Sequence, residues 1–341
     1  MTSSNNLRFA KRVALGIFIV VINCVFIEGS AAESGGFVVA WGDNSMGAVN
    51  GVRSQDQKAV GSIASGGKLL EGVSGIATGS THCIALLLNG TVAGWGASPY
   101  EQSLLVSGRE LTNVMAVAAA STHSLALKSD GTLIAWDGNG TGAYGAADVP
   151  RGLSNVIAIA AGWNRSLALK RDGTVVGWGT RSVPSGLSNI TAIAATDMDF
   201  GYDLALKKDG SVVQWERNGK LLPGPAEAAP AIAIAAGASQ SLALRRDGTV
   251  VKWRNVLTGT MIHPEITSVH PGLSNVVAIA SAQMRNLALK SDGTVAAWGS
   301  MNAPVPVPEG LSNVVAIATA QSFSLAITTN KAVADRFSAE P

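Results

Sequence analysis

A single phrase recurs along this chain, and it limits the possible fold more than any other feature. It reads LALKSDGTLIAW at residues 125–136, LALKRDGTVVGWG at 167–179 and NLALKSDGTVAAWG at 286–299. Aligned on its tryptophan, the phrase recurs with spacings of 54, 41, 42, 37, 38 and 45 residues, at Trp41, Trp95, Trp136, Trp178, Trp215, Trp253 and Trp298. A repeat of about 40 residues is typical of folds in which each unit buries the apolar faces of its neighbours.

The phase of the repeat is as informative as its period. A second pattern, NVxAIAAGxxxSLAL, also occurs seven times and begins near Gly72, Asn113, Asn155, Asn189, Pro230, Asn275 and Asn313. The chain opens with the tryptophan half alone, at 37–44, and closes with the other half alone, at 313–330. These two halves add up to one unit. We therefore expect the strand at 37–42 to pair with the strands at 313–328 and close a ring, because an open ring exposes apolar faces and strand edges.

Each unit has the pattern of short antiparallel strands. An apolar run, the dipeptide Asp-Gly and a second apolar run form a strong hairpin signal. Units of about 40 residues with three or four such strands are the blades of β-propellers. We therefore predict an all-β fold over residues 33–330, a seven-bladed β-propeller with blades of three or four short antiparallel strands. The spacings of 37 and 38 residues leave little room for a full fourth strand, so some blades are expected to have three.

Residues that recur in every unit are interpreted as structural. The glycine of the Asp-Gly pair suits a turn position with positive φ. The aspartates look like a row of carboxylates, but we interpret them as turn residues that bond their own backbone; they are Asp130, Asp172, Asp209, Asp247 and Asp292. The tryptophans are expected to pack between neighbouring blades.

The two ends of the chain lie outside the repeat. Basic residues within 8–12 are followed by an apolar run over 13–27 and by small residues at 30–32, which is the order of a secretory signal peptide. The apolar run is shorter than the roughly 20 residues of a membrane span, although an uncleaved anchor is an alternative. We predict a Sec-type signal peptide at 1–32, a secreted or periplasmic protein with no membrane attachment after cleavage, and a C-terminal tail at 331–341.

Charge and cysteine content narrow the classes of partner. The chain has 25 basic and 23 acidic residues, and removal of 1–32 leaves 22 of each. A neutral chain lacks the basic excess that nucleic-acid binding usually needs, so nucleic acid is not an expected partner. Cys83 is the single cysteine beyond the signal sequence, so no intrachain disulfide is expected and stability must come from packing. We expect a monomer.

The repeated words are similar to those of a known family. HSLALKSDGTLIAW at 123–136 and WGDNSMG at 41–47 resemble the regulator of chromosome condensation repeat family, over about 37–330. The resemblance implies a seven-bladed propeller, and the short repeats with a signal sequence look like the secreted bacterial branch, which includes a propeller-type inhibitor of beta-lactamases. The family's GQLG motif after the tryptophan is absent, and its nearest equivalent is at 47–49. The signal sequence and neutral charge argue against the nucleotide-exchange activity of the family's nuclear members.

Positions that differ between units are the candidates for partner binding. One lies just before the serine of SLAL, at a turn on one rim of the predicted ring, and it is occupied by His82, His123, Arg165, Tyr202, Gln240, Arg285 and Phe323. Neighbouring candidates are Trp163, Phe200 and Met284. Aromatic and arginine side chains at a rim suit protein-binding hot spots, and the resemblance to the inhibitor branch points to the same rim. Two alternatives are structural histidines at 82 and 123 and a packing role for Trp163.

Two insertions and two substitutions also depart from the repeat. The insertions cover 43–71, which is polar and rich in glycine and serine, and 254–271, which contains two of the four histidines. Gln214 and Lys252 replace the small residue that precedes the tryptophan elsewhere, which indicates a wetter face there.

Catalytic and metal-binding patterns are missing from the sequence. It contains no G-x-S-x-G, no phosphate loop and no Cys–His pair in a plausible register. The four histidines lack the paired spacing of a zinc site. We therefore predict a protein that is not an enzyme and holds no cofactor or metal: an exported scaffold that engages a protein partner through one propeller rim. A cell-surface glycan-binding propeller is the alternative, and an inhibitor of a secreted enzyme is a further one.

Overall fold

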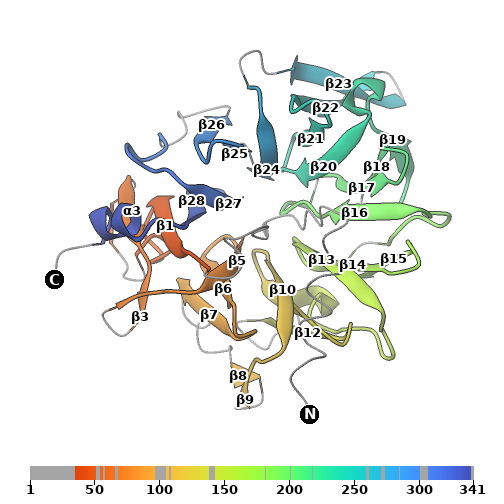
Figure 1. Cartoon of the computed structure of the whole chain (residues 1–341). Coiled ribbons are helices and arrows are strands. Elements are labelled where there is room, and N and C mark those ends of the chain that lie inside the picture. Colours follow the sequence, from red (N-terminus) through yellow and green to blue (C-terminus); the bar gives the residue numbers. More distant parts are fainter. Residues whose placement is uncertain are drawn as a thin grey trace, which may run out of the picture.

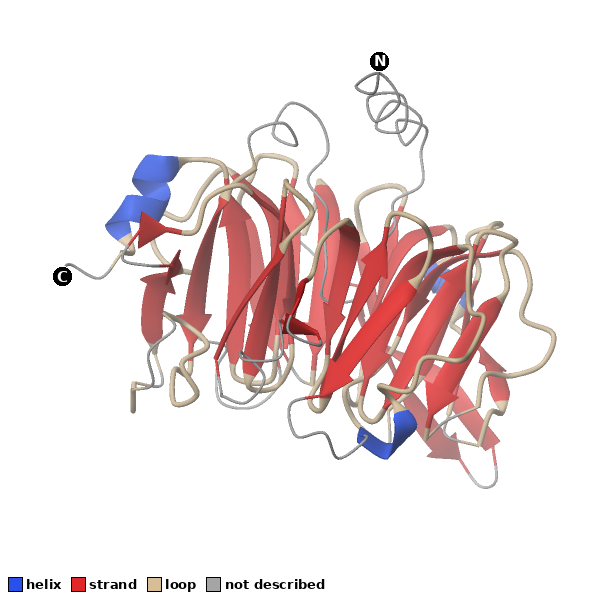
Figure 2. Ribbon diagram, turned by 90° about the horizontal axis from the view of Figure 1, so that it is seen from below, coloured by secondary structure: helices blue, strands red, loops and turns tan. Residues whose placement is uncertain are grey.

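The structure, a computed structural model, describes residues 35–50, 54–56, 58–65, 68–96, 105–106, 109–137, 143–180, 182–199, 201–216, 218–258, 261–269, 273–283, 285–299 and 306–338. Within these residues, seven sheets of three or four antiparallel strands follow one another around a ring (Figure 1). Seen from the side, the strands run between two faces that carry the turns (Figure 2). The predicted all-β propeller with seven blades is confirmed. The signal peptide predicted at 1–32 lies outside the described residues.

Six blades are built from consecutive segments of the chain. Blade 1 contains β5 (Val73–Thr78), β6 (His82–Leu87) and β7 (Val92–Gly96). Blade 2 contains β10 (Val114–Ala119), β11 (His123–Lys128) and β12 (Leu133–Asp137), and blade 3 contains β13 (Val156–Gly162), β14 (Arg165–Lys170) and β15 (Val175–Gly179). Blade 4 contains β16 (Ile190–Ala194), β17 (Asp203–Lys207), β18 (Val212–Trp215) and β19 (Leu221–Pro223). Blade 5 contains β20 (Ala231–Ala236), β21 (Ser241–Arg245), β22 (Val250–Thr258) and β23 (Met261–Val269), and blade 6 contains β24 (Val276–Ala282), β25 (Arg285–Lys290) and β26 (Val295–Gly299).

The seventh blade joins the two ends of the repeat region, and we call it the shared blade. Its strand order is β2 (Ala59–Ser62), β1 (Phe37–Gly42), β28 (Phe323–Thr328) and β27 (Val314–Thr319). Strands β1 and β28 are antiparallel, with Trp41 opposite Ser324 and Gly42 opposite Phe323. The predicted pairing of the N-terminal strand with the C-terminal half-repeat is therefore present in the structure.

The Asp-Gly turns connect each blade to the next through the backbone. In blade 2, the Asp130 carboxylate accepts a hydrogen bond from the backbone N–H of Thr132 (2.9 Å), and Gly131 has a φ of 79°. The carbonyl oxygen of Gly131 then accepts from the N–H of Val156, the first residue of β13 in blade 3 (3.2 Å). The equivalent contact recurs after Gly90, Gly173, Gly210, Gly248 and Gly293. We call this side of the ring the Asp-Gly face, and the opposite side, where each innermost strand turns into the second strand, the rim face.

The repeated asparagine before each innermost strand also has a backbone reason. It adopts a φ between 53° and 59° in five blades, at Asn113, Asn155, Asn189, Asn275 and Asn313. Asparagine tolerates this left-handed region better than most residues with a side chain. Its carbonyl oxygen accepts from the residue that opens the neighbouring turn, as in the bond from Arg171 N–H to Asn155 O (2.9 Å).

Two tryptophan indoles bind the loop that follows the tryptophan strand of the preceding blade. The Nε1 of Trp178 donates to the carbonyl oxygen of Ala146 (2.8 Å), and the Nε1 of Trp95 donates to that of Ala48 (3.0 Å). Both tryptophans are more than 90% buried, which agrees with the predicted packing between blades. Residues 145–146 are thus structurally equivalent to 47–48. The search for the GQLG motif in the sequence found only the segment at 47–49.

Some elements depart from the simple repeat. The 38-residue interval after Trp215 holds the three-residue strand β19, so a short spacing does not exclude a fourth strand. Smaller elements lie in the linkers: β3 (Ala64–Ser65), β4 (Lys68–Leu69), β8 (Leu105–Val106), β9 (Arg109–Glu110) and the 3-10 turns η2 (Ala143–Gly145) and η3 (Ala226–Ala228). The insertion at 43–71 therefore contributes β2, β3 and β4 in its described part.

The segment expected as a C-terminal tail begins with a helix, α3 (Lys331–Arg336), at the edge of the shared blade (Figure 2). The Asn330 side chain caps this helix by accepting from the N–H of Ala332 (3.0 Å). Val333 and Ala334 are buried, and Ser62 of β2 donates through its Oγ to the carbonyl oxygen of Ala334 (2.6 Å). The part of the chain that the structure describes contains no helix long and apolar enough to span a membrane.

Candidate binding surface on the rim face

The predicted partner-binding residues lie at the rim-face turns, but most of their side chains are covered. His82, His123, Arg165, Gln240 and Phe323 are all at least 94% buried. Burial favours the alternative of structural histidines at 82 and 123, and it extends the same interpretation to the other three. Trp163, Tyr202 and Arg285 are half-buried. Phe200 and Met284 lie outside the described residues.

The buried rim residues connect each blade to the next, and two histidines show the basic arrangement. The Nε2 of His82 in blade 1 is 2.8 Å from the Oγ of Ser124 in blade 2. The Nε2 of His123 in blade 2 is 2.7 Å from the Oγ of Ser166 in blade 3. In both cases the residue before the serine position of SLAL in one blade bonds the serine of the following blade; in blade 1 that position holds Cys83. We call each such couple a latch pair.

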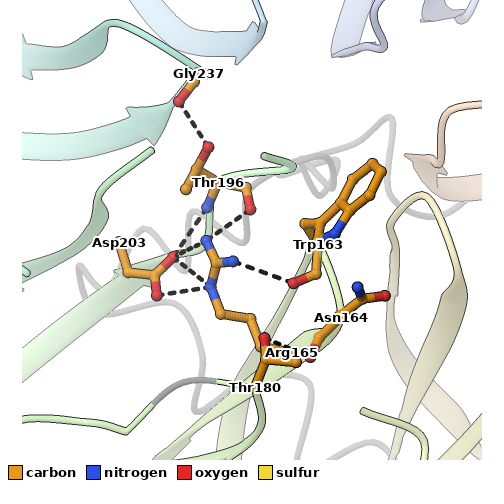
Figure 3. Close-up of polar contacts among 7 residues, drawn as sticks. All are labelled: Trp163, Asn164, Arg165, Thr180, Thr196, Asp203 and Gly237. Atoms are coloured by element: carbon orange, nitrogen blue, oxygen red, sulfur yellow. Dashed lines mark hydrogen bonds and ion pairs between the residues drawn. The ribbon is translucent and has the colours of Figure 1, made fainter. Parts of the chain in front are cut away.

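At the junction between blades 3 and 4 the latch pair is ionic (Figure 3). The Nε of Arg165 donates to the Asp203 carboxylate at 2.8 and 2.9 Å, and its Nη2 donates to Oδ1 at 2.6 Å. Asp203 stands at the position that serine occupies in blades 2 and 3. The same guanidinium donates to the carbonyl oxygens of Thr196 (2.8 Å) and Trp163 (3.2 Å). Both charged side chains are at most 1% exposed.

Other junctions use different chemistry at the same two positions. Between blades 5 and 6, the Nε2 of Gln240 donates to the Oδ1 of Asn286 (2.8 Å). Between the shared blade and blade 1, Phe323 packs in the same apolar cluster as Cys83, which replaces the serine there. Between blade 6 and the shared blade, the Nη2 of Arg285 donates to the carbonyl oxygen of Ser322 (3.2 Å). At three junctions, those of Arg165, Gln240 and Phe323, the change at the candidate position is accompanied by a change at the serine position of the next blade.

The two histidines are held in their neutral form. Burial lowers the pKa of His82 from 6.5 to about 4. Burial, together with the nearby His82 and the positive charge of Arg165, lowers the pKa of His123 to about 3. A neutral imidazole whose Nε2 is engaged by a serine suits a structural bond between blades rather than proton transfer at a surface.

The rim-face turn of blade 4 reaches across the ring. It comprises 195–202, eight residues against two to four in the other blades. The Asp197 carboxylate accepts from the backbone N–H of Ser121 (3.0 Å) and its Oγ (2.8 Å) in blade 2, and from the Oγ of Ser80 in blade 1 (3.1 Å). The sulfur of Met198 accepts from the Nε2 of Gln283 in blade 6 (3.6 Å). One turn thus touches three other blades, and burial raises the pKa of Asp197.

Trp163 is the aromatic residue that this framework presents most directly. Its backbone N–H donates to the carbonyl oxygen of Thr196 (3.1 Å), and its own carbonyl oxygen accepts from Arg165. Its indole points away from the guanidinium (Figure 3) and is half-buried. The buried ion pair therefore fixes the backbone of a residue whose side chain is partly open to solvent. Among the described residues, no group of three or more His, Cys, Asp and Glu side chains could hold a metal ion.

Comparison with known proteins places this geometry among propellers. Residues 156–180 match the model of the Regulator of chromosome condensation (RCC1) repeat. The crystal structure of human WBSCR16 is similar at 15% identity and a TM-score of 0.65, covering 86% of this chain and 100% of that chain. Yeast RCC1 (Prp20), in a crystal structure bound to Kap60, is similar at 16% identity and a TM-score of 0.66, covering 91% of this chain and 92% of that chain.

A plant structure extends the comparison. The CRINKLY WD40 ectodomain of the Arabidopsis thaliana receptor kinase ACR4 is similar at 19% identity and a TM-score of 0.53, covering 84% of this chain and 98% of that chain. The comparison with curated proteins found no match. Taken together, the repeated half-units, the seven blades and these structural neighbours show that the chain is a β-propeller, and residues 156–180 match the RCC1 repeat.

Proposed function

We propose that this chain is an exported scaffold that holds a partner protein against its rim face. The signal-type sequence at 1–32 supports export. The latch pairs support a scaffold, because they use buried polar groups to fix neighbouring blades relative to one another. The yeast propeller of similar fold was crystallised with the protein Kap60, which is in keeping with protein binding by such rings.

The observation that carries the proposal is the position of Trp163. Its backbone is held from both sides by the network of Arg165, Asp203 and Thr196, while its indole is half-buried at the rim face. Tryptophan is among the residues that dominate binding energies at protein interfaces. A side chain on a backbone that is already ordered loses less entropy on binding than one on a mobile loop.

The binding test compares two truncations on opposite faces. Trp163→Ala removes the rim-face indole, whereas Leu88→Ala removes an apolar side chain that is 45% exposed beside the turn at Gly90, on the Asp-Gly face. Proteins captured from the exported fraction by the wild-type chain are measured again with each variant. We expect capture to fall at least about tenfold with Trp163→Ala, as for a loss of 1.4 kcal/mol or more, and to be unchanged with Leu88→Ala. Equal capture by both variants would contradict binding of the partner at the rim face.

Export has its own test. Fractionation of the producing cells, followed by N-terminal sequencing of the product, should place the protein outside the cytoplasm with its first residue near position 33. A full-length chain confined to the cytoplasm would contradict this part of the proposal and leave the binding result standing.

A further inference from the structure

The junction between blades 4 and 5 contains a cavity of about 250 Å³ at the rim face. Its lining includes Tyr202 from the long turn of blade 4, Ser239 and Gln240 from the turn of blade 5, Ser241 from β21, and Arg254 and Asn255 from β22. Tyr202 and Ser241 occupy the two latch positions of this junction. The cavity therefore lies at the two positions that carry the latch residues at other junctions.

The outer wall of the cavity exists because β22 does not stop at the rim. In blades 1 and 3 the tryptophan is followed by Gly96 and Gly179, where a Cβ would strike the backbone of the neighbouring turn. Blade 5 has Arg254 at this position, and β22 runs on for five residues, paired with β23. The insertion noted at 254–271 therefore builds a wall above the turn of its own blade.

A buried layer behind the cavity orients one of its lining side chains. The Nε2 of Gln214 donates to the Oδ1 of Asn255 (2.8 Å), and the Nδ2 of Asn255 donates to the Oε1 of Gln214 (3.1 Å). Gln214 is fully buried; it also donates to the carbonyl oxygen of Pro223 (3.1 Å) and accepts from the Nε1 of Trp253 (3.2 Å). Five other blades have only alanine or glycine at this position, so the exceptional glutamine and the exceptional Asn255 belong to one arrangement.

The charge at the cavity is balanced. The Nε and Nη2 of Arg254 each lie 3.0 Å from the Oε2 of Glu265 on β23. A guanidinium already paired with a carboxylate attracts an anion less than an unpaired one does. Arg254 still supplies N–H donors, the Asn255 amide and the hydroxyls of Ser239 and Ser241 supply both donors and acceptors, and Tyr202 supplies an aromatic ring.

We propose that this cavity binds one sugar residue of a neutral saccharide. A pyranose ring carries several hydroxyl groups, each both donor and acceptor, on a ring whose C–H faces pack well against an aromatic side chain. The volume is slightly below the roughly 300–1,000 Å³ of sites for drug-sized ligands, which fits one sugar unit with the remainder of a chain outside. This site is separate from Trp163 and does not depend on the binding of a partner protein.

The test is saturation-transfer NMR of the full chain with four probes: methyl glucopyranoside, methyl galactopyranoside, methyl mannopyranoside and N-acetylglucosamine. We expect transfer to at least one of these sugars at millimolar concentration. Ser239→Trp places an indole over an exposed position of the cavity lining and should raise the Kd for that sugar at least about tenfold. Gln321→Trp, at an exposed position in the rim turn of the shared blade, is the matched control and should leave the Kd unchanged.

Arg254→Ala is a second variant, on an exposed side chain, and it should also weaken sugar binding several-fold. Thermal unfolding shows whether each variant is folded. Transfer to none of the four sugars, or transfer that Ser239→Trp and Arg254→Ala leave intact, would overturn the proposal. Binding of inorganic phosphate that these variants abolish, with no sugar bound, would assign the cavity to an anion and would also overturn it.

Discussion

The guanidinium of Arg165 and the carboxylate of Asp203 join blades 3 and 4 through three hydrogen bonds, and both side chains are almost completely buried. At the two preceding junctions the same positions hold histidine and serine. The ring therefore tolerates different chemistry at a latch.

Arg165→Ala should destabilise the protein by about 3–5 kcal/mol, because it leaves the Asp203 carboxylate buried without its partner. The double variant Arg165→His with Asp203→Ser copies the latch pair of the two preceding junctions. We expect its free energy of unfolding to be higher than that of Arg165→Ala, because it leaves no buried charge without a partner. Urea unfolding followed by tryptophan fluorescence measures both.

Two single variants complete this experiment as a thermodynamic cycle. Arg165→His and Asp203→Ser should each be less stable than the double variant. Additive effects of the two single changes would mean that the pair does not act as a unit.

Acid should weaken the ring through its buried histidines. The pKa of His82 falls from 6.5 to about 4 on folding, and that of His123 to about 3. Between these values and 6.5 the unfolded chain binds more protons, so stability declines as the pH drops below about 6.5. At pH 5 each histidine should contribute a loss of about 2 kcal/mol relative to pH 7.5.

Glutamine replacements isolate this effect. His82→Gln and His123→Gln keep a side chain that can hydrogen-bond the serine, as Gln240 bonds Asn286 at its own latch, but they do not titrate. The difference in unfolding free energy between pH 7.5 and pH 5 should shrink by about 2 kcal/mol in each variant. Other titrating groups, including Asp197 with its raised pKa, are common to all the chains and drop out of the comparison.

Gly179→Ala should be far more harmful than Gly152→Ala, although both glycines have positive φ, at 96° and 77°. A Cβ at Gly179 would strike the carbonyl oxygen of Asn164 in the rim turn, whereas the space around Gly152 is open. The open site should lose only about 1–2 kcal/mol from backbone strain, and the crowded site at least about 3 kcal/mol. Denaturant unfolding measures the loss of unfolding free energy in both variants. Equal losses would show that the rim turn moves aside for the added Cβ at little cost.

Asp197→Asn should loosen the turn that crosses the ring. Asparagine has one acceptor oxygen where aspartate has two, so the bonds from Ser80 and Ser121 cannot all persist. We expect faster amide hydrogen exchange within 195–202 and at Ser121, with a global loss of about 1–2 kcal/mol. Asp199→Asn, an exposed change on the same turn, is the control; equal acceleration in both variants would refute a specific role for Asp197.

Much of the fold follows from the sequence because its determinants are local and repeated. An Asp-Gly turn and the apolar runs around it specify a hairpin in every unit. The phase of the two half-repeats specifies which strands meet in the shared blade. The helix α3 could not be predicted in this way, because it is short and occurs only once in the described residues. Its burial depends on contacts with β1 and β28 and not on a repeated pattern of its own.

The structural role of the rim residues is less evident from the sequence, because each latch pair joins two different positions in neighbouring repeats. His82, His123 and Arg165 occupy the same position in successive repeats and differ from one another. A position that varies between repeats is also expected on a binding surface, so this variation alone does not distinguish the two roles. The pairing becomes visible when the residue before the serine position in one repeat is compared with the serine position of the next repeat, as for Arg165 with Asp203 or Phe323 with Cys83. Both members of these two pairs depart from the repeat, and the sequence alone contains this information. The support of Asn255 by Gln214 could not be read in this way, because it depends on how far β22 extends.

The shared blade has a consequence for synthesis. The strand β1 is synthesised before the strands of blades 1 to 6, whereas its main neighbour, β28, is synthesised after them. Until then, the apolar sides of blades 1 and 6 have no cover, and a chain truncated before 313 keeps them exposed for good. Pairing of β1 with β28 in the shared blade is therefore the last step that covers these faces during synthesis.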